Sequence, residues 1–210
     1  MNQETGHLGA VVYIVDDDAS VRRSLTRLLQ ASGFLVEAFA NADEFLAKRE
    51  HAACGCLVLD VAMPGLNGLE LQEKLAAVEN IMPIIFITGH GDVPMSVRAM
   101  KAGAVDFLTK PFDEKDLLQA VAVAIERGRS TQADAARKQA VKSRAARLSP
   151  REREVLAHII SGKLNKQIAA DIGTVEKTVK VHRSRIMKKM EAKSIAELVR
   201  LAEQAGIKPC

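Results

Sequence analysis

The chain reads VVYIVDDD at residues 11–18, a short apolar run that stops at three carboxylates. Three further apolar runs end in the same way, on a polar or ionisable side chain: Leu57–Leu59, Ile84–Ile87 and Phe107–Leu108. Continuous apolar runs of this length are typical of strands that are buried on both faces of a parallel sheet. Helical patterns of about a dozen residues separate the runs, and this alternation predicts an α/β fold with a doubly wound sheet.

The first domain is predicted to be a (βα)5 unit over residues 1–125, with Phe34–Phe39 as its second strand. Its fourth helix is expected to begin near Asp92 and Pro94, because Pro fits the first turn of a helix. The apolar residues of that helix divide into two faces. The face expected to pack against the sheet consists of Val93, Val97, Met100 and Ala104. The opposite face would then expose an apolar strip that suits a partner surface, formed by Met95, Ala99 and Ala102.

Chemistry in an open parallel sheet is expected just beyond the carboxyl ends of the strands. Asp16, Asp17 and Asp60 follow two strands that would be neighbours, and such carboxylates can share one Mg²⁺ ion. Asp60 stands alone at its strand end and is the candidate nucleophile for an aspartyl-phosphate. Lys110 supplies a cation and Thr88 a hydroxyl for the charge on the phosphoryl oxygens. The five residues together predict a phosphoryl-transfer site.

Two other interpretations of this site can be weighed. Acids and a lysine at strand ends can be ordinary solvated termini, but five such residues at matching strand ends argue against that. A phosphatase with an aspartyl nucleophile, as in the haloacid dehalogenase group, needs a second Asp two residues after the first as its general acid. Ala62 occupies that position, so the sequence favours a phosphoacceptor over an enzyme.

Charge divides the chain into two halves. Residues 1–125 hold 10 Lys and Arg against 17 Asp and Glu, whereas residues 126–210 hold 20 against 9. A basic half suggests a polyanionic partner. The three cysteines (Cys54, Cys56 and Cys210) suit neither a disulfide framework nor a metal motif, and no run approaches the roughly 18 apolar residues of a membrane span. We therefore expect a cytoplasmic protein with no membrane partner.

Residues 126–147 are predicted to be a solvated linker, helical or flexible, because they carry no apolar face. Ser149, Pro150 and Glu152 then mark the start of a helix and of an all-α domain of four helices over residues 148–210. Asn165 is expected to cap the second helix of this domain, and the third helix follows it. Gly173 between them offers the turn of a helix-turn-helix.

The third helix of this domain, from about Val175 to Met190, has two distinct faces. Val179, Ile186 and Met190 form a core stripe. The opposite face carries the residue types that read a major groove, with cations for phosphates and guanine, a hydroxyl, and a small apolar side chain for thymine: Lys177, Lys180, Val181, Ser184, Arg185 and Lys188. Two other interpretations of this face remain: an ordinary solvated basic surface, or a surface that binds a protein or RNA.

The first 125 residues resemble the receiver domain of two-component response regulators, and of the FixJ subgroup in particular. The matching positions are Asp16–Asp17, Asp60 followed by Met-Pro-Gly, Thr88, and Lys110 followed by Pro111. The resemblance implies that Asp60 accepts a phosphoryl group from a sensor histidine kinase. It also implies a backbone carbonyl ligand to Mg²⁺ from Ala62, an aromatic switch at Phe107 and a cis Lys110–Pro111 bond. Ala62 departs from the arginine that many members carry there.

Residues 148–202 resemble the LuxR/FixJ-type DNA-binding domain. The matching stretches are LSPREREVL at 148–156, Asn165–Ala169 and TVKVH at 178–182. Thr174 and Val175 depart from the apolar residue and Ser that usually precede the third helix, so its cap is expected to shift to Thr174. The resemblance implies that Lys180, Val181 and Ser184 face bases, and that the phosphate contacts come from Lys166, Thr178 and Arg185. It further implies a transcription regulator, not an enzyme, that forms a homodimer on phosphorylation, binds double-stranded promoter DNA and has RNA polymerase as a possible partner.

Overall fold

The computed structural model describes residues 10–48, 55–77, 82–89 and 93–210. The chain divides into two compact units, Met1–Gln132 and Ala133–Cys210, which we describe separately as the first and second units. Within the described ranges, no helix is both long enough and apolar enough to cross a membrane.

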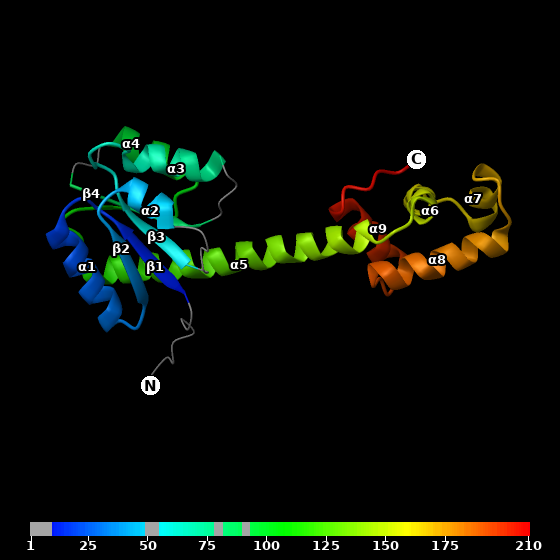
Figure 1. The fold of residues 1–210 in the computed structure, drawn as a ribbon, viewed down its shortest axis with the longest axis horizontal. Helices are drawn as coiled ribbons and strands as arrows, with labels where there is room; N and C mark the ends of the chain where they lie inside the picture. The colour runs from blue at the N-terminus through cyan, green and yellow to red at the C-terminus, as the bar shows by residue number, and fades with distance from the viewer. Residues whose placement is uncertain (1–9, 49–54, 78–81, 90–92) are drawn as a thin grey trace. The chain divides into compact units, whose positions relative to one another are not determined.

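The first unit contains a five-stranded parallel sheet (Figure 1). Its strand order is β2-β1-β3-β4-β5. The bounds of the strands are β1 Val11–Val15, β2 Leu35–Phe39, β3 Gly55–Asp60, β4 Ile84–Thr88 and β5 Asp106–Thr109. Every residue of β3 and β4 is buried, as expected for central strands covered on both faces. The predicted (βα)5 sheet is confirmed.

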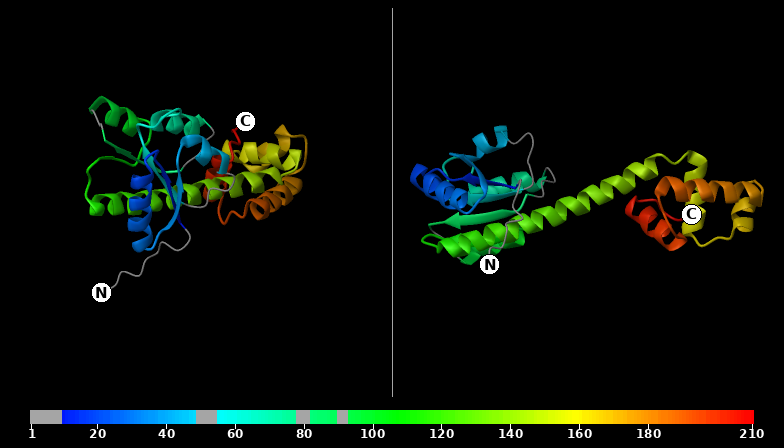
Figure 2. Two further views of the ribbon diagram at one scale, coloured as in Figure 1. Left: turned by 60° about the vertical axis from the view of Figure 1, so that its left-hand side comes forward. Right: turned by 90° about the horizontal axis from the view of Figure 1, so that it is seen from below.

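Helices cover both faces of this sheet, as Figures 1 and 2 show. α1 (Ala19–Ala31) and the first part of α5 (Glu114–Ala146) lie on one face, where Leu25, Leu29 and Leu117 are buried. The other face is covered by α2 (Ala42–Lys48), α3 (Gly68–Ala77) and α4 (Val93–Lys101). Two hydrophobic layers therefore hold the strands in place and leave their carboxyl ends open for chemistry.

The predicted orientation is wrong within α4, although just beyond the end of the helix Ala104 is buried and Ala102 is exposed, as expected. Ala99 is fully buried and Met95 packs into the core, whereas Val93 is 75% exposed and Val97 and Met100 are each 44% exposed. Apolar residues occupy both faces of this helix, so its hydrophobic period allows two orientations. The small side chain of Ala99 lets the helix approach closely, and the buried Gln72 amide donates to the Ala99 carbonyl at 3.2 Å.

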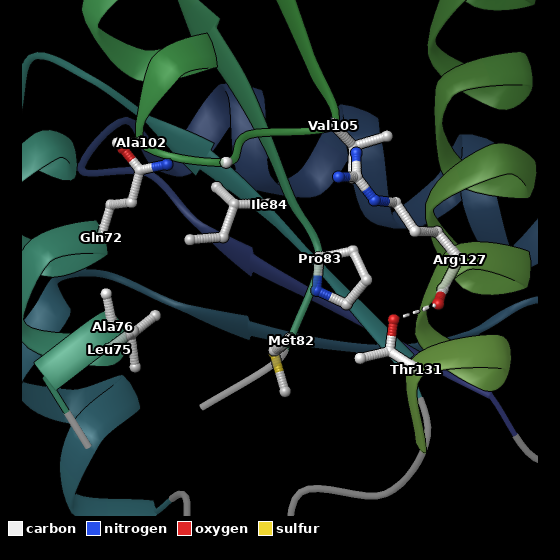
Figure 3. A pocket seen from close by; sticks show the side chains of 11 residues that line it. Gln72, Leu75, Ala76, Met82, Pro83, Ile84, Ala102, Val105, Arg127 and Thr131 are labelled. Carbon is white, nitrogen blue, oxygen red and sulfur yellow. Dashed lines mark hydrogen bonds between the residues drawn. The ribbon is translucent and has the colours of Figure 1, made fainter. Parts of the chain in front are cut away.

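A hollow of about 220 Å³ lies at the edge of the sheet where β4 begins, opposite the carboxyl ends (Figure 3). Its lining includes Arg127 and Thr131 of α5. Close by, a β-carbon added to the buried Gly128 would lie 3.1 Å from the Pro83 ring. α5 therefore packs on the first unit beyond residue 125, up to Thr131.

The second unit contains four further helices around one core: α6 Pro150–Ile160, α7 Asn165–Asp171, α8 Glu176–Met190 and α9 Ile195–Gln204. The end of α5 also belongs to this core, because Val141 and Ala145 are buried in it together with Leu148. The expectation that residues 126–147 lack any packing face is therefore wrong at this end. Two side chains one helical turn apart form too short a stripe to stand out in the sequence.

Candidate phosphoacceptor site and nucleic-acid interface

Asp16, Asp60 and Lys110 come together at the carboxyl edge of the sheet. Asp16 follows β1, Asp60 ends β3 and Lys110 follows β5. The Lys110 ammonium donates to Asp16 Oδ2 at 2.8 Å and to Asp60 Oδ1 at 3.0 Å. The two carboxylates are 1% and 4% exposed. One lysine therefore bridges two buried acids from different strands, 94 and 50 residues away in sequence.

Thr88 and Phe107 flank this cluster. Thr88 is fully buried at the end of β4, next to β3 in the sheet. Its backbone carbonyl accepts a hydrogen bond of 2.7 Å from the Lys110 amide, which positions the lysine, and the Lys110–Pro111 bond is cis as expected. The half-buried Phe107 ring lies 6.2 Å from the Phe86 ring, centroid to centroid.

Local backbone geometry orients both carboxylates. Asp16 Oδ1 accepts from the Asp18 amide at 2.8 Å, and Asp60 Oδ2 accepts from the Ala62 amide at 3.1 Å. The start of α3 packs closely against the turn that follows Asp60. A β-carbon on Gly68 would lie only 2.4 Å from the Asp60 carbonyl oxygen, so this contact requires glycine. Sequence analysis did not single out Arg22, whose guanidinium donates to the Asp16 carbonyl at 2.6 Å. No motif in the sequence marks that role.

Burial raises the pKa of Asp60, because desolvation penalises the charged carboxylate. The nearby charges of Asp16 and Asp17 raise this pKa further, and the hydrogen bond and charge of Lys110 offset only part of the increase. Burial acts in the opposite direction on Lys110, but its hydrogen bonds to Asp16 and Asp60 outweigh it, so the pKa of Lys110 is raised. The site thus holds more negative charge than its single lysine neutralises.

The donor set fits Mg²⁺ in part. Within the described residues, no three His, Cys, Asp or Glu side chains form a group that could hold a metal ion. Asp17 is exposed, and Asp18 caps α1 through its hydrogen bond from the Ser20 amide at 2.7 Å. Mg²⁺ nevertheless often takes only one or two carboxylates, with water and phosphate oxygens as its other ligands. Asp16 and Asp60 provide carboxylates of this kind, and the Mg²⁺-binding roles of Asp16, Asp17, Asp60 and the Ala62 carbonyl all stay predictions.

The second unit presents the predicted two-faced helix, α8. Val179, Ile186 and Met190 are fully buried. All six residues predicted for the opposite face are exposed, including Lys180, Ser184 and Arg185. Lys166 is exposed on α7, whereas Thr178 is half-buried. The structure therefore brings a cationic, partly apolar face to the surface of the second unit.

A buried carboxylate fixes α8 against α6. Glu152 is 3% exposed and accepts from the Lys189 ammonium at 2.6 Å and from the Ser149 amide at 2.8 Å. Burial acts to raise the pKa of Glu152, but the hydrogen bond from Lys189 and that from Ser149 outweigh it and lower this pKa. Lys189 also donates to the Arg147 carbonyl at 3.1 Å. The sequence predicted the helix cap at Ser149 and Glu152 but not this link to α8.

Two predicted helix caps are wrong. The N-cap of α7 is Leu164, whose amide donates to Gln167 Oε1 at 2.8 Å, so Asn165 already lies inside the helix. The N-cap of α8 is Val175, which provides no side-chain hydrogen bond, and Thr174 lies one residue too early. The N-cap of α7 lies one residue before the predicted cap and that of α8 one residue after it, a difference of the size common at helix ends.

Comparisons with known proteins agree with both units. The response regulator receiver domain family matches residues 12–122, and the family described as bacterial regulatory proteins, luxR family, matches residues 146–202. Nodulation protein W of Bradyrhizobium diazoefficiens is 50% identical over 198 residues, which cover 94% of this chain and 87% of that protein. Transcriptional regulatory protein FixJ of the same species is 45% identical over 93% of this chain and 96% of its own length.

Solved structures lead to the same family. That of the response regulator StyR is 47% identical and has a TM-score of 0.84, covering 93% of this chain and 99% of that one. Full-length FixJ from B. japonicum is 45% identical with a TM-score of 0.58, covering 94% and 97%. The chain therefore belongs to the two-component response regulators of the FixJ group, which join a receiver domain to a LuxR-type DNA-binding domain.

Proposed function

We propose that this chain is a transcription regulator whose binding to promoter DNA is controlled by phosphorylation of Asp60. A sensor histidine kinase is its phosphodonor, Mg²⁺ its metal ion, and RNA polymerase a further partner at the promoter. The observation that carries this proposal is the buried Asp16–Lys110–Asp60 cluster, in which one lysine bridges two carboxylates at the carboxyl edge of the sheet.

The cluster suits phosphoryl transfer for a specific reason. Attack by an Asp60 carboxylate oxygen forms a P–O bond while the P–N bond to the donor imidazole breaks. The transferred group brings negative charge into a site that already holds an excess of it, so cations are needed. Lys110 can turn from the carboxylates to a phosphoryl oxygen, and Thr88 can donate its hydroxyl to another. Mg²⁺ bound by Asp16 and Asp60 would neutralise the remaining charge.

The assignment of Asp60 can be tested by labelling the full-length protein with radioactive acetyl phosphate and Mg²⁺. We expect Asp60→Asn, or removal of divalent metal with a chelator, to abolish the acid-stable, base-labile label of an aspartyl-phosphate. The matched control is Asp18→Asn, because Asp18 lies beside the cluster but caps α1. Undiminished labelling of the Asp60→Asn protein would show that the phosphoacceptor is another residue.

DNA binding is assigned to the exposed face of α8 because that face combines cations, a hydroxyl and the 44% exposed Val181. Affinity for duplex DNA should fall steeply with salt, since the basic residues release counterions from phosphates. Lys180→Ala should cost on the order of 1–3 kcal/mol and relax sequence preference, whereas Lys166→Ala should weaken all sequences alike. Uniform weakening by both substitutions in filter-binding assays would remove the distinction between the two lysines.

Phosphorylation is proposed to cause dimerisation through α4. The exposed apolar residues of α4 are Val93, Val97 and Met100, and these replace the strip expected from the sequence. Charge at Asp60 would draw in Thr88 and let Phe107 turn, which would alter the adjoining surface. Sedimentation of the full chain with and without a phosphoryl mimic should show a dimer that Val97→Glu prevents. The control Leu35→Glu changes an exposed residue of β2 at the other end of the sheet.

A further inference from the structure

Glu176 is an unusual residue on the proposed DNA-binding helix. It is the only carboxylate within α8, all of which is described, and it occupies the first helical position. Its side chain is 47% exposed. A carboxylate here is costly if the helix approaches phosphates, because like charges repel. In a helix that enters the major groove with its N-terminal residues at the bases, however, the same position favours a base contact.

Lys180 lies one turn further along α8 and pairs with Glu176. The Lys180 ammonium is 3.2 Å from Glu176 Oε1, and the lysine side chain is 65% exposed. Exposed pairs with this spacing of four residues are weak, so a binding partner can separate or share them easily. The pair therefore presents a hydrogen-bond donor beside an acceptor on the exposed face of the helix, without strong bonds that hold either group away from a ligand.

One base pair offers the matching pattern. In the major groove a G·C pair presents the N7 and O6 acceptors of guanine beside the N4 amino donor of cytosine. A lysine ammonium suits the guanine acceptors, and a glutamate carboxylate suits the cytosine amino group. A·T pairs place an amino group between two acceptors and a methyl group at the edge, which suits this pair of side chains less well.

We propose that Glu176 and Lys180 act as one unit that reads a single G·C base pair, and that Glu176 is a determinant of sequence specificity. The inference rests on the proposed DNA binding and deepens it. A carboxylate at the start of a helix also interacts favourably with the helix dipole. That interaction alone would make Glu176 matter for the stability of α8 and not for the choice of base pair.

The test uses the full-length protein with acetyl phosphate and Mg²⁺. A duplex is first selected from random sequences with the wild-type protein, and each of its G·C pairs is then replaced in turn by A·T. We expect one replacement to weaken wild-type binding by about tenfold or more, a size typical of a lost base contact. Glu176→Gln and Lys180→Ala should each reduce this discrimination to about twofold at that same base pair.

Glu191→Gln is the matched control, because it removes the same charge at the C-terminal end of α8, where Glu191 pairs with Arg144. It should leave discrimination at every base pair unchanged. Full discrimination by Glu176→Gln, or loss at a different base pair from Lys180→Ala, would overturn the inference while DNA binding itself stands. If the wild-type protein selects no duplex at all, the proposed function fails with it.

Discussion

Two buried carboxylates, Asp60 in the first unit and Glu152 in the second, each lie within 3.0 Å of a lysine ammonium, yet their pKa values shift in opposite directions. Glu152 has the Lys189 ammonium and an amide donor, with no second acid among the causes of its shift. Asp60 shares Lys110 with Asp16. Glu152, with hydrogen-bond donors of its own, stabilises the fold of the second unit. Within the described part of the chain, Asp60 shares its only cation with Asp16, so its carboxylate can gain from a further cation.

The largest effect is expected where the second unit loses its carboxylate. Glu152→Gln removes the charge partner of Lys189 and weakens the cap of α6, and we expect it to lower the free energy of unfolding of this unit by about 2–3 kcal/mol. Urea titration of the full chain, followed by hydrogen exchange of the α6 and α8 amides, measures this loss. Glu154→Gln, which affects only an exposed pair with Arg151, should cost less than about 0.5 kcal/mol.

Removing the charge of Asp60 should have the opposite sign. Because the folded-state pKa of Asp60 is raised, its ionisation opposes folding at neutral pH. We expect Asp60→Asn to stabilise the first unit by on the order of 1 kcal/mol at pH 7 while it abolishes phosphorylation. Hydrogen exchange of the β3 and β4 amides reports the gain. Equal or lower protection in the variant would show that the bond from Lys110 outweighs burial.

The stabilities of the two units are expected to respond differently to acid. Glu152 has its folded-state pKa below the ordinary 4.5, so its contribution to stability is present above pH 4.5 and is lost as the pH falls through the folded-state value. Asp60 has its folded-state pKa above the ordinary 3.8, so its cost is relieved as the pH falls from that value toward 3.8. On acidification we therefore expect two differences in the free energy of unfolding to shrink. The difference between the wild-type protein and Glu152→Gln should vanish, and the stabilisation by Asp60→Asn should become smaller.

The smallest effect concerns the caps of the second unit. α6 begins at Ser149 with reciprocal hydrogen bonds to Glu152, whereas α8 begins at Val175 without a side-chain cap. Val175→Ser should let a hydroxyl accept an amide hydrogen bond and stabilise the second unit by about 0.5–1 kcal/mol. Thermal unfolding of the full chain checks this, with Thr174→Ser as the control. No gain would mean that the first turn of α8 is satisfied in another way.

The sequence predicted the strands and the residues at their ends because buried apolar runs and strand polarity leave few choices. It could not predict which face of α4 is buried, because both faces carry apolar side chains: Met95 and Ala99 on one, Val93 and Val97 on the other. Nor could it show that Lys110 bridges Asp16 and Asp60, since that contact depends on side-chain geometry across three strands. Sequence analysis also missed the Glu176–Lys180 pair, although opposite charges four residues apart on a helix are a signal that could have found it.

The most direct test of the central claim is the affinity of the full-length protein for its selected duplex, measured by fluorescence anisotropy with and without acetyl phosphate and Mg²⁺. If phosphorylation of Asp60 controls DNA binding through dimerisation, the dissociation constant of the wild-type protein should fall by about tenfold or more, a typical coupling between two sites. The Asp60→Asn protein should keep its unphosphorylated affinity throughout. Equal affinities of the wild-type protein in both conditions, or the same gain in Asp60→Asn, would contradict the account.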